Sequence, residues 1–198
     1  MSEFTMKRYD VIEIIVNSQL LQMRFEEREI QLQILQNTNY SDLAAWKVLP
    51  IEIQKEFSSN QALKSADNKR YDCILMMWLK DELKGVSNEY LSTTIKKINS
   101  YTGEIEGTPF PMITCPCCGY KTLDDPTPFA ICEVCWWEND GQDSHNADEN
   151  KGNPNGLSLT QARNNFVKHG IYDPSRTDLF KYQKPKEMFV QGSLKTSK

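Results

Sequence analysis

The chain has 198 residues, of which 39% are hydrophobic, and its 23 lysines and arginines against 27 acids give a net charge of −4. This length allows one ordinary domain or two small ones, with enough apolar residues for a packed interior. The acidic balance argues against nucleic acid as a general partner, because acidic side chains repel phosphate. The apolar run from Val11 to Val16 contains Glu13 and is too short for a membrane span or a signal sequence. We therefore expect a cytoplasmic protein with reduced thiols and no membrane contact.

Helical periodicity and scarce glycines characterise the chain up to about Thr102. Ser41 and Ser87 are predicted N-caps, Pro50 is predicted to start a helix, and Gly85 to end one. The predicted helices occupy residues 6–36 (two helices or one bent helix), 41–46, 51–57, 70–84 and 87–98. The apolar residues from Cys73 to Leu79 are predicted to form the buried centre of this region, which shows no recognisable catalytic constellation.

Two glycines and two prolines between Ser100 and Pro111 indicate a linker. We place a helical domain at residues 1–102, the linker at 103–112, a second domain at 113–180 and a basic flexible tail at 181–198. In the second domain, residues 120–123 and 129–132 are predicted to be paired strands joined by 124–128. Asn153 to Gly156 is a predicted turn. A capping box of Ser158 and Gln161 predicts a helix over 159–169 that ends at Gly170.

Two C-x-x-C pairs, Cys115/Cys118 and Cys132/Cys135, are separated by thirteen residues. Two such turns can bring four thiolates to tetrahedral geometry, so we predict one structural zinc ion. Gly119 directly follows Cys118, the second cysteine of the first pair, and glycine suits the positive φ of such a turn. A dithiol redox motif uses the same atoms, but it has no need of a second matched pair.

Two further residues, Cys117 and His145, are alternative metal ligands. Cys117 lies inside the first pair and either replaces a neighbour as ligand or points away. If His145 replaced a cysteine, the site would open, or His145 could form a second site with nearby aspartates. The expected site is nevertheless closed, because four cysteine ligands leave no position for water or substrate. We therefore predict no catalytic residue and no enzymatic activity.

The pattern Cys115-Pro-Cys-Cys-Gly-Tyr120, Ile131-Cys-x-x-Cys-Trp-Trp-Glu138, Gly141-Gln142, Asn155-Gly-Leu-Ser-Leu159 and Asn165-Phe166 resembles the bacterial cysteine-rich CPCC family. The resemblance covers about Cys115 to Phe166 and leaves the first hundred residues unassigned. It implies a small zinc-ribbon-like module of bacterial cytoplasmic proteins, some of them encoded beside polymorphic toxins as immunity proteins. Together with the helical periodicity, it predicts an α+β chain: a mainly helical N-terminal region followed by a zinc-ribbon-like module with a C-terminal helix.

Residues 122–150 contain eight acids and no lysine or arginine. Of Trp136 and Trp137, which follow the second pair, we expect at least one to cover the zinc site and pack on the C-terminal helix and the other to be exposed. Exposed tryptophan beside acidic residues is typical of a protein interface, and an acidic surface attracts a basic partner. We therefore expect a non-enzymatic immunity protein that binds and neutralises a basic toxin domain. The predicted partner-binding residues are Trp136, Trp137, Glu138, Asp140 and Asp143.

Two other functions stay open at this point. A nucleic-acid-associated zinc-ribbon regulator would require the basic residues of the carboxyl-terminal part to form one face. These residues are Arg163, Lys168, Arg176, Lys181, Lys184 and Lys186. A thiol enzyme would use Cys117, and a metal-dependent hydrolase would need an open metal site.

Overall fold

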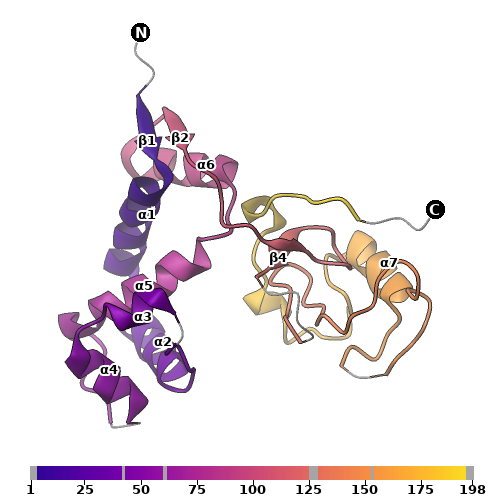
Figure 1. Ribbon diagram of the computed structural model, residues 1–198, viewed down its shortest axis with the longest axis horizontal. Coiled ribbons are helices and arrows are strands. Elements are labelled where there is room, and N and C mark those ends of the chain that lie inside the picture. Colours follow the sequence, from indigo (N-terminus) through magenta and orange to yellow (C-terminus); the bar gives the residue numbers. More distant parts are fainter. Residues whose placement is uncertain (1–3, 42, 60–61, 125–128, 153, 195–198) are drawn as a thin grey trace. The chain divides into compact units, whose positions relative to one another are not determined.

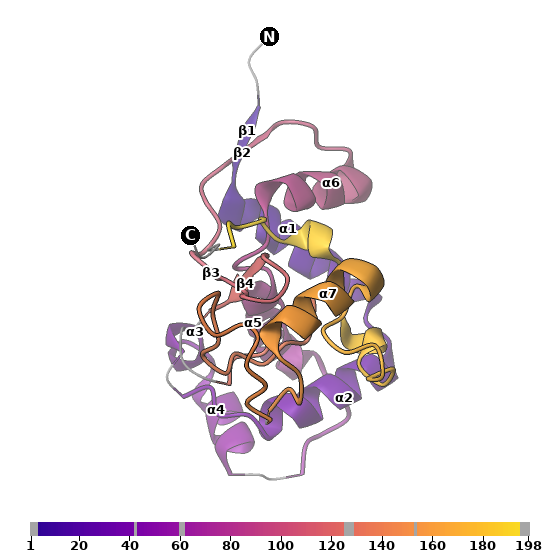
Figure 2. The same cartoon turned by 90° about the vertical axis from the view of Figure 1, so that its right-hand side faces the viewer.

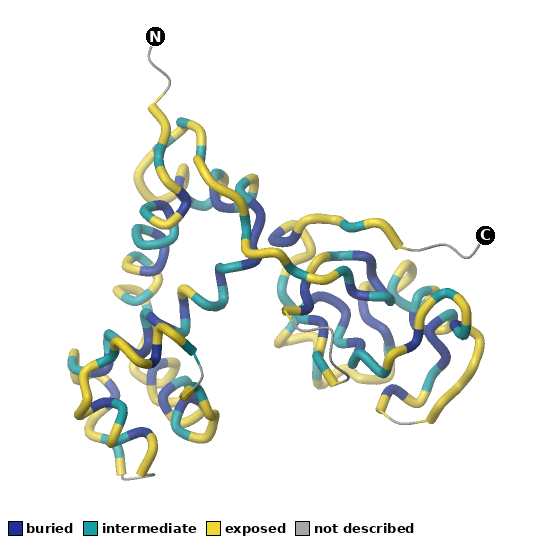
Figure 3. The backbone as a smooth tube through the Cα atoms, in the orientation of Figure 1, coloured by how far each residue is buried: buried dark blue, intermediate teal, exposed yellow. Residues whose placement is uncertain are grey.

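The computed structural model describes residues 4–41, 43–59, 62–124, 129–152 and 154–194 (Figure 1). Contacts divide the chain into two compact units: residues 1–84 with 91–108, and residues 85–90 with 109–198. Each unit has its own buried interior (Figure 3). The mixture of helices and short strands confirms the predicted fold class. Within the described ranges, no helix combines the length and the apolar character that crossing a membrane requires.

The first unit is mainly helical. Its elements are β1 (Thr5–Lys7), α1 (Arg8–Gln22), α2 (Phe25–Gln36), α3 (Ala44–Lys47), α4 (Ile51–Ser58), η1 (Lys69–Tyr71), α5 (Asp72–Glu82), the part of α6 (Asn88–Asn99) from residue 91 onward, and β2 (Glu104–Glu106). The stretch predicted as two helices or one bent helix is two helices, α1 and α2. The Ser41 N-cap is wrong, because α3 begins later and its N-cap is Leu43. Asp42 lies outside the described residues.

A small parallel sheet in the first unit is not predicted by any sequence pattern. Strands β1 and β2 pair from Thr5 with Glu104 to Lys7 with Glu106. Tyr101 supports this pairing, because its hydroxyl donates to the Phe4 carbonyl oxygen at 2.7 Å. The paired strands are about a hundred residues apart in the chain, and a three-residue strand has no periodicity of its own to reveal the pairing.

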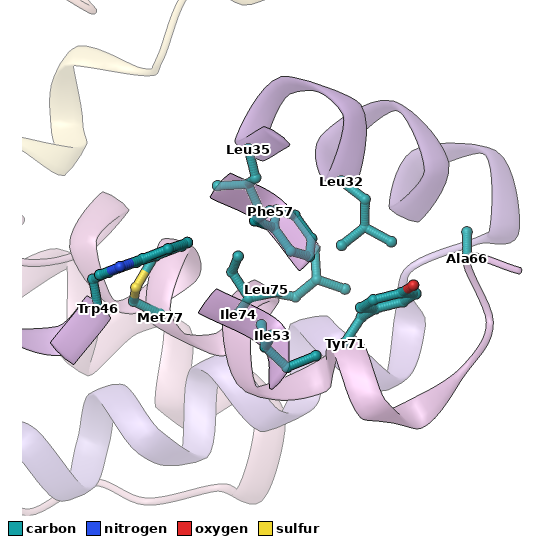
Figure 4. Packing of buried hydrophobic residues seen from close by; sticks show 10 residues of the cluster. All are labelled: Leu32, Leu35, Trp46, Ile53, Phe57, Ala66, Tyr71, Ile74, Leu75 and Met77. Carbon is teal, nitrogen blue, oxygen red and sulfur yellow. The ribbon is translucent and has the colours of Figure 1, made fainter. Parts of the chain in front are cut away.

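A cluster of buried side chains from α2, α3, α4, η1, α5 and the loop before η1 forms part of the core of the first unit. Figure 4 shows Trp46 and Met77 at one end of this cluster and Tyr71 and Ala66 at the other. Phe57 meets Tyr71 edge to face, with ring centroids 5.9 Å apart. Cys73 packs against the cluster, in agreement with the interpretation of the apolar stretch as core.

The second unit contains β3 (Ile113–Thr114), β4 (Lys121–Leu123), α7 (Leu159–His169), η2 (Phe180–Tyr182) and η3 (Lys186–Met188). The strand predicted at residues 120–123 is confirmed as β4, but its partner is β3 and not residues 129–132 (Figure 2). Residues 129–132 instead pair with the chain that follows them, through the bridge between Ile131 and Glu138. Of the connections predicted at 124–128 and 153–156, residues 125–128 and 153 lie outside the described residues.

The capping box predicts the start of α7 correctly. The Ser158 hydroxyl accepts from the Gln161 N–H at 3.2 Å, and the Gln161 side chain accepts from the Ser158 N–H at 3.0 Å. At the other end, Gly170 adopts φ +76°, the left-handed conformation that favours glycine at a helix end. These local signals fix α7 at Leu159–His169, the predicted range.

The flexible tail predicted at residues 181–198 is wrong for residues 181–194. Gln183 donates to the Val134 and Gly170 carbonyl oxygens at 2.7 and 2.9 Å. Phe189 is buried and bridges to Val86, while Gln191 bridges to Tyr120. The three lysines at 181, 184 and 186 led to the prediction of a flexible tail, although the apolar residues Met188 and Phe189 follow them and are buried. Residues 195–198 lie outside the described residues.

Candidate metal centre

Two turns of the same design hold the four cysteines, and we call Cys115–Gly119 the first knuckle and Cys132–Trp136 the second knuckle. In the first, the Gly119 N–H donates to the Cys115 carbonyl oxygen at 3.0 Å, and the Cys115 N–H donates to Tyr120 at 2.8 Å. In the second, the Trp136 N–H donates to the Cys132 carbonyl oxygen at 2.8 Å, and the Cys132 N–H donates to Trp137 at 2.9 Å. Each knuckle is therefore the tip of a short hairpin.

The fifth residue of each knuckle has a left-handed backbone. Gly119 has φ +80°, which confirms the reason given for a glycine there. Trp136 has φ +66° at the equivalent place. A side chain with a β-carbon is strained in this conformation by roughly 1–2 kcal/mol. The tryptophan is held there by packing, since its ring lies 6.1 Å from that of Tyr182.

The four sulfur atoms converge in one place. Cys115 Sγ and Cys135 Sγ are 3.7 Å apart, Cys118 Sγ and Cys132 Sγ are 3.5 Å apart, and all four lie within 4.8 Å of one another. Four sulfurs at about 2.3 Å from a central ion would be about 3.8 Å from each other, so the arrangement fits a tetrahedral metal site. All four cysteines are buried. The structure thus brings the four predicted ligands together at a site placed to hold a metal ion.

Hydrogen bonds to sulfur single out Cys132. The Thr122 hydroxyl donates to Cys132 Sγ at 3.0 Å, and the Cys135 N–H donates to the same sulfur at 3.5 Å. Burial acts to raise the pKa of Cys132, but the hydrogen bonds from the other three thiols and Thr122 lower it well below the usual value. Burial raises the pKa of Cys115 and of Cys135 well above the usual value. A cation here would stabilise all four thiolates, because its charge compensates for their burial.

Aromatic and α7 side chains cover the knuckles. Trp137 is fully buried and meets Tyr172 edge to face at 6.1 Å, and the Tyr172 N–H donates to the Cys135 carbonyl oxygen at 3.0 Å. From α7, Arg163 Nε donates to the Pro116 carbonyl oxygen at 3.0 Å. These contacts hold both turns and exclude water from the sulfurs.

The alternative ligands lie outside the four-sulfur group. Cys117 is buried, yet its sulfur is not among the atoms that lie within 4.8 Å of one another. His145 is exposed, and its backbone N–H donates to Asp143 Oδ1 at 2.8 Å. In the described part of the chain, His145 and the nearby aspartates form no metal-ligating group.

The predicted partner-binding residues differ in exposure. Trp137 is fully buried, so the prediction that it contacts a partner is wrong. Trp136, Glu138 and Asp140 are partly buried, and Asp143 is exposed. The role of Thr122 as a hydrogen-bond donor to Cys132 is not predicted by any sequence motif, because it depends on how two hairpins are arranged in space.

Residues 113–187 match the model of the cysteine-rich CPCC family, which confirms the resemblance seen in the sequence. The matched segment begins with β3 and ends within η3, so it includes both knuckles, α7 and η2 but not the buried residues Met188 and Phe189. The search of curated proteins and the search of solved structures gave no match.

Proposed function

From the cysteine-rich CPCC match of residues 113–187, we propose that the protein is a non-enzymatic protein-binding protein with one structural zinc ion. The observation that carries this proposal is the buried group of four cysteine sulfurs. Zinc accepts four thiolates in a tetrahedron, and four protein ligands complete its coordination. Such an ion stabilises the fold because its binding energy is available only to the folded ligand set.

The partner that fits best is a basic protein, and we extend the proposal to a bacterial immunity protein that neutralises a cognate toxin in the cytoplasm. Residues 122–150 carry eight acids without a lysine or arginine. A zinc ion with four thiolates would add about −2 to this charge. An acidic surface accelerates association with a basic protein and can cover a cleft that binds phosphate, so the binding protein needs no active site.

Three of the six basic residues that a nucleic-acid surface would use already have partners within the chain, which favours a protein partner. Lys184 pairs with Glu133, and Arg176 pairs with Asp178 at 3.1 Å. Arg163 is used in hydrogen bonds to Pro116 and Ser144. The ion pairs of Lys184 and Arg176 offset the charge that these two residues would offer to phosphate. Cys117 is also a poor candidate nucleophile, because a buried thiol is not open to a substrate.

The test is capture with the tagged full-length protein from a nuclease-treated lysate of its source organism. The captured protein is then purified and mixed with the tagged protein to test direct binding. In a separate growth assay, it is expressed in cells alone and together with the tagged protein. We expect a stable binary complex, and we expect that co-expression rescues growth that the partner alone inhibits. A parallel capture from untreated lysate is the control: nucleic acid or protein that is recovered there but lost after nuclease treatment would contradict the proposal, as would a purified partner that does not bind.

A further inference from the structure

The hairpin of the second knuckle exposes two apolar side chains. Phe129 is 71% exposed and Ile131 is 47% exposed, although Cys132 beside them is fully buried. The backbone under them is well held: the Phe129 N–H donates to the Asn139 carbonyl oxygen at 2.7 Å, and the Asn139 N–H donates to Ala130 at 2.8 Å. An exposed aromatic ring on a fixed backbone loses little freedom on binding, which favours its use as an anchor.

Backbone strain at Phe129 separates this ring from an ordinary exposed residue. Phe129 has φ +83°, a conformation in which bulky side chains are rare. Trp136 has a similar φ, but its packing on Tyr182 explains that strain. Among the described residues, packing does not explain the strain at Phe129, because they leave this residue 71% exposed. Asparagine or glycine would adopt this backbone at lower cost, so the ring itself points to a contact outside the chain.

Two acidic residues, Glu138 and Asp140, lie on the opposite arm of this hairpin. Glu138 lies opposite Ile131 in the hairpin bridge. Asn155 fixes this acidic arm, since it accepts from the Glu138 N–H at 3.0 Å and donates to the Glu138 carbonyl oxygen at 2.9 Å. Its amide also donates to Asp140 Oδ2 at 3.3 Å. Apolar anchors with a charged rim are the usual composition of a protein interface.

We propose that Phe129 and Ile131, with Glu138 and Asp140 at the rim, form the surface that docks a lysine- or arginine-rich segment of a partner protein. The inference rests on the proposed function, because it requires a protein partner, and it adds which part of the chain makes the contact. Charge complementarity selects the occupant: the acids attract basic side chains and repel both phosphate and a second copy of the same acidic surface.

The first test replaces Phe129 by the photoreactive residue p-benzoylphenylalanine in the full chain. Val167, which is 84% exposed on α7 of the same unit, is replaced in the same way as the control. After irradiation of source cells, we expect a protein adduct from position 129 that maps to a basic segment, and none from position 167. An adduct from position 167 alone would overturn the surface assignment but leave the proposed function standing. The absence of any protein adduct, or an adduct to a second copy, would overturn the inference.

The second test measures the affinity of the purified partner for Phe129→Asn, with Val167→Gln as the matched control. Asparagine tolerates positive φ, so the variant should keep its zinc content and melting temperature. We expect a loss of affinity of about tenfold or more for Phe129→Asn and no change for Val167→Gln. A loss that accompanies a lower melting temperature would indicate a structural role, and unchanged affinity would overturn the proposal.

Discussion

Replacing Thr122 by valine tests how the protein stabilises its thiolates. Thr122 is buried, and its hydroxyl is 3.0 Å from Cys132 Sγ. Valine keeps the branched shape that suits strand β4 but removes this donor. Serine at the same position keeps the hydroxyl, so Thr122→Ser is the matched control.

The expected loss of zinc affinity follows from the hydrogen-bond donors at Cys132. Loss of a hydrogen bond to a metal ligand costs about 10- to 100-fold in metal affinity, or about 1.4 to 2.7 kcal/mol. The Cys135 N–H still donates to Cys132 Sγ, at 3.5 Å. We therefore expect the lower end, about tenfold. A structural zinc site contributes about 10–16 kcal/mol, so the variant should stay loaded and folded.

Competition with a chromophoric zinc chelator measures this change. Thr122→Val should lose zinc to about tenfold less chelator than wild type, while Thr122→Ser should behave like wild type. The variant should also release zinc at a higher pH, because loss of the donor raises the pKa of the Cys132 thiol and protons compete better. Equal affinities and release profiles for all three proteins would refute the role of the hydroxyl.

Three further predictions test the packing of the two units. Trp137→Ala should lower the free energy of unfolding of the second unit by about 3–5 kcal/mol in urea, because the side chain is fully buried. A decrease below about 1 kcal/mol would contradict the role of Trp137 in covering the knuckles. Phe189→Ala should lower the urea midpoint of the same unit because Phe189 is buried, whereas no change is expected if residues 181–194 are a flexible tail. Leu75→Ala should lower the free energy of unfolding of the first unit by about 2–5 kcal/mol. Metal analysis of the folded variant should find the metal content unchanged, because the two units have separate interiors. Loss of metal from the folded variant would contradict that separation.

Local signals made some elements predictable from the sequence. The helix α7 begins at a capping box and ends at a glycine, and both signals depend on residues a few positions apart. The same holds for the metal centre, because each C-x-x-C pair forms its own turn. Fixed spacing within each turn is thus enough to predict which four cysteines lie together.

Features that depend on contacts between distant segments could not be predicted. Strand β4 pairs with β3 before the first knuckle, and β1 pairs with β2 across about a hundred residues. The adjacent tryptophans look equivalent in the sequence, but Trp137 is buried against Tyr172 while Trp136 adopts the left-handed turn position. Only the fold distinguishes them, and it excludes Trp137 as an exposed anchor.

The most direct test of a structural zinc centre is the mass of the intact protein under native conditions, with its metal retained. The account predicts one zinc ion per chain. It also predicts that Cys132→Ser, purified in parallel, carries little or none and loses the folded second unit. A metal-free wild-type protein with a folded second unit would contradict the account, because it would show that the four buried sulfurs need no ion.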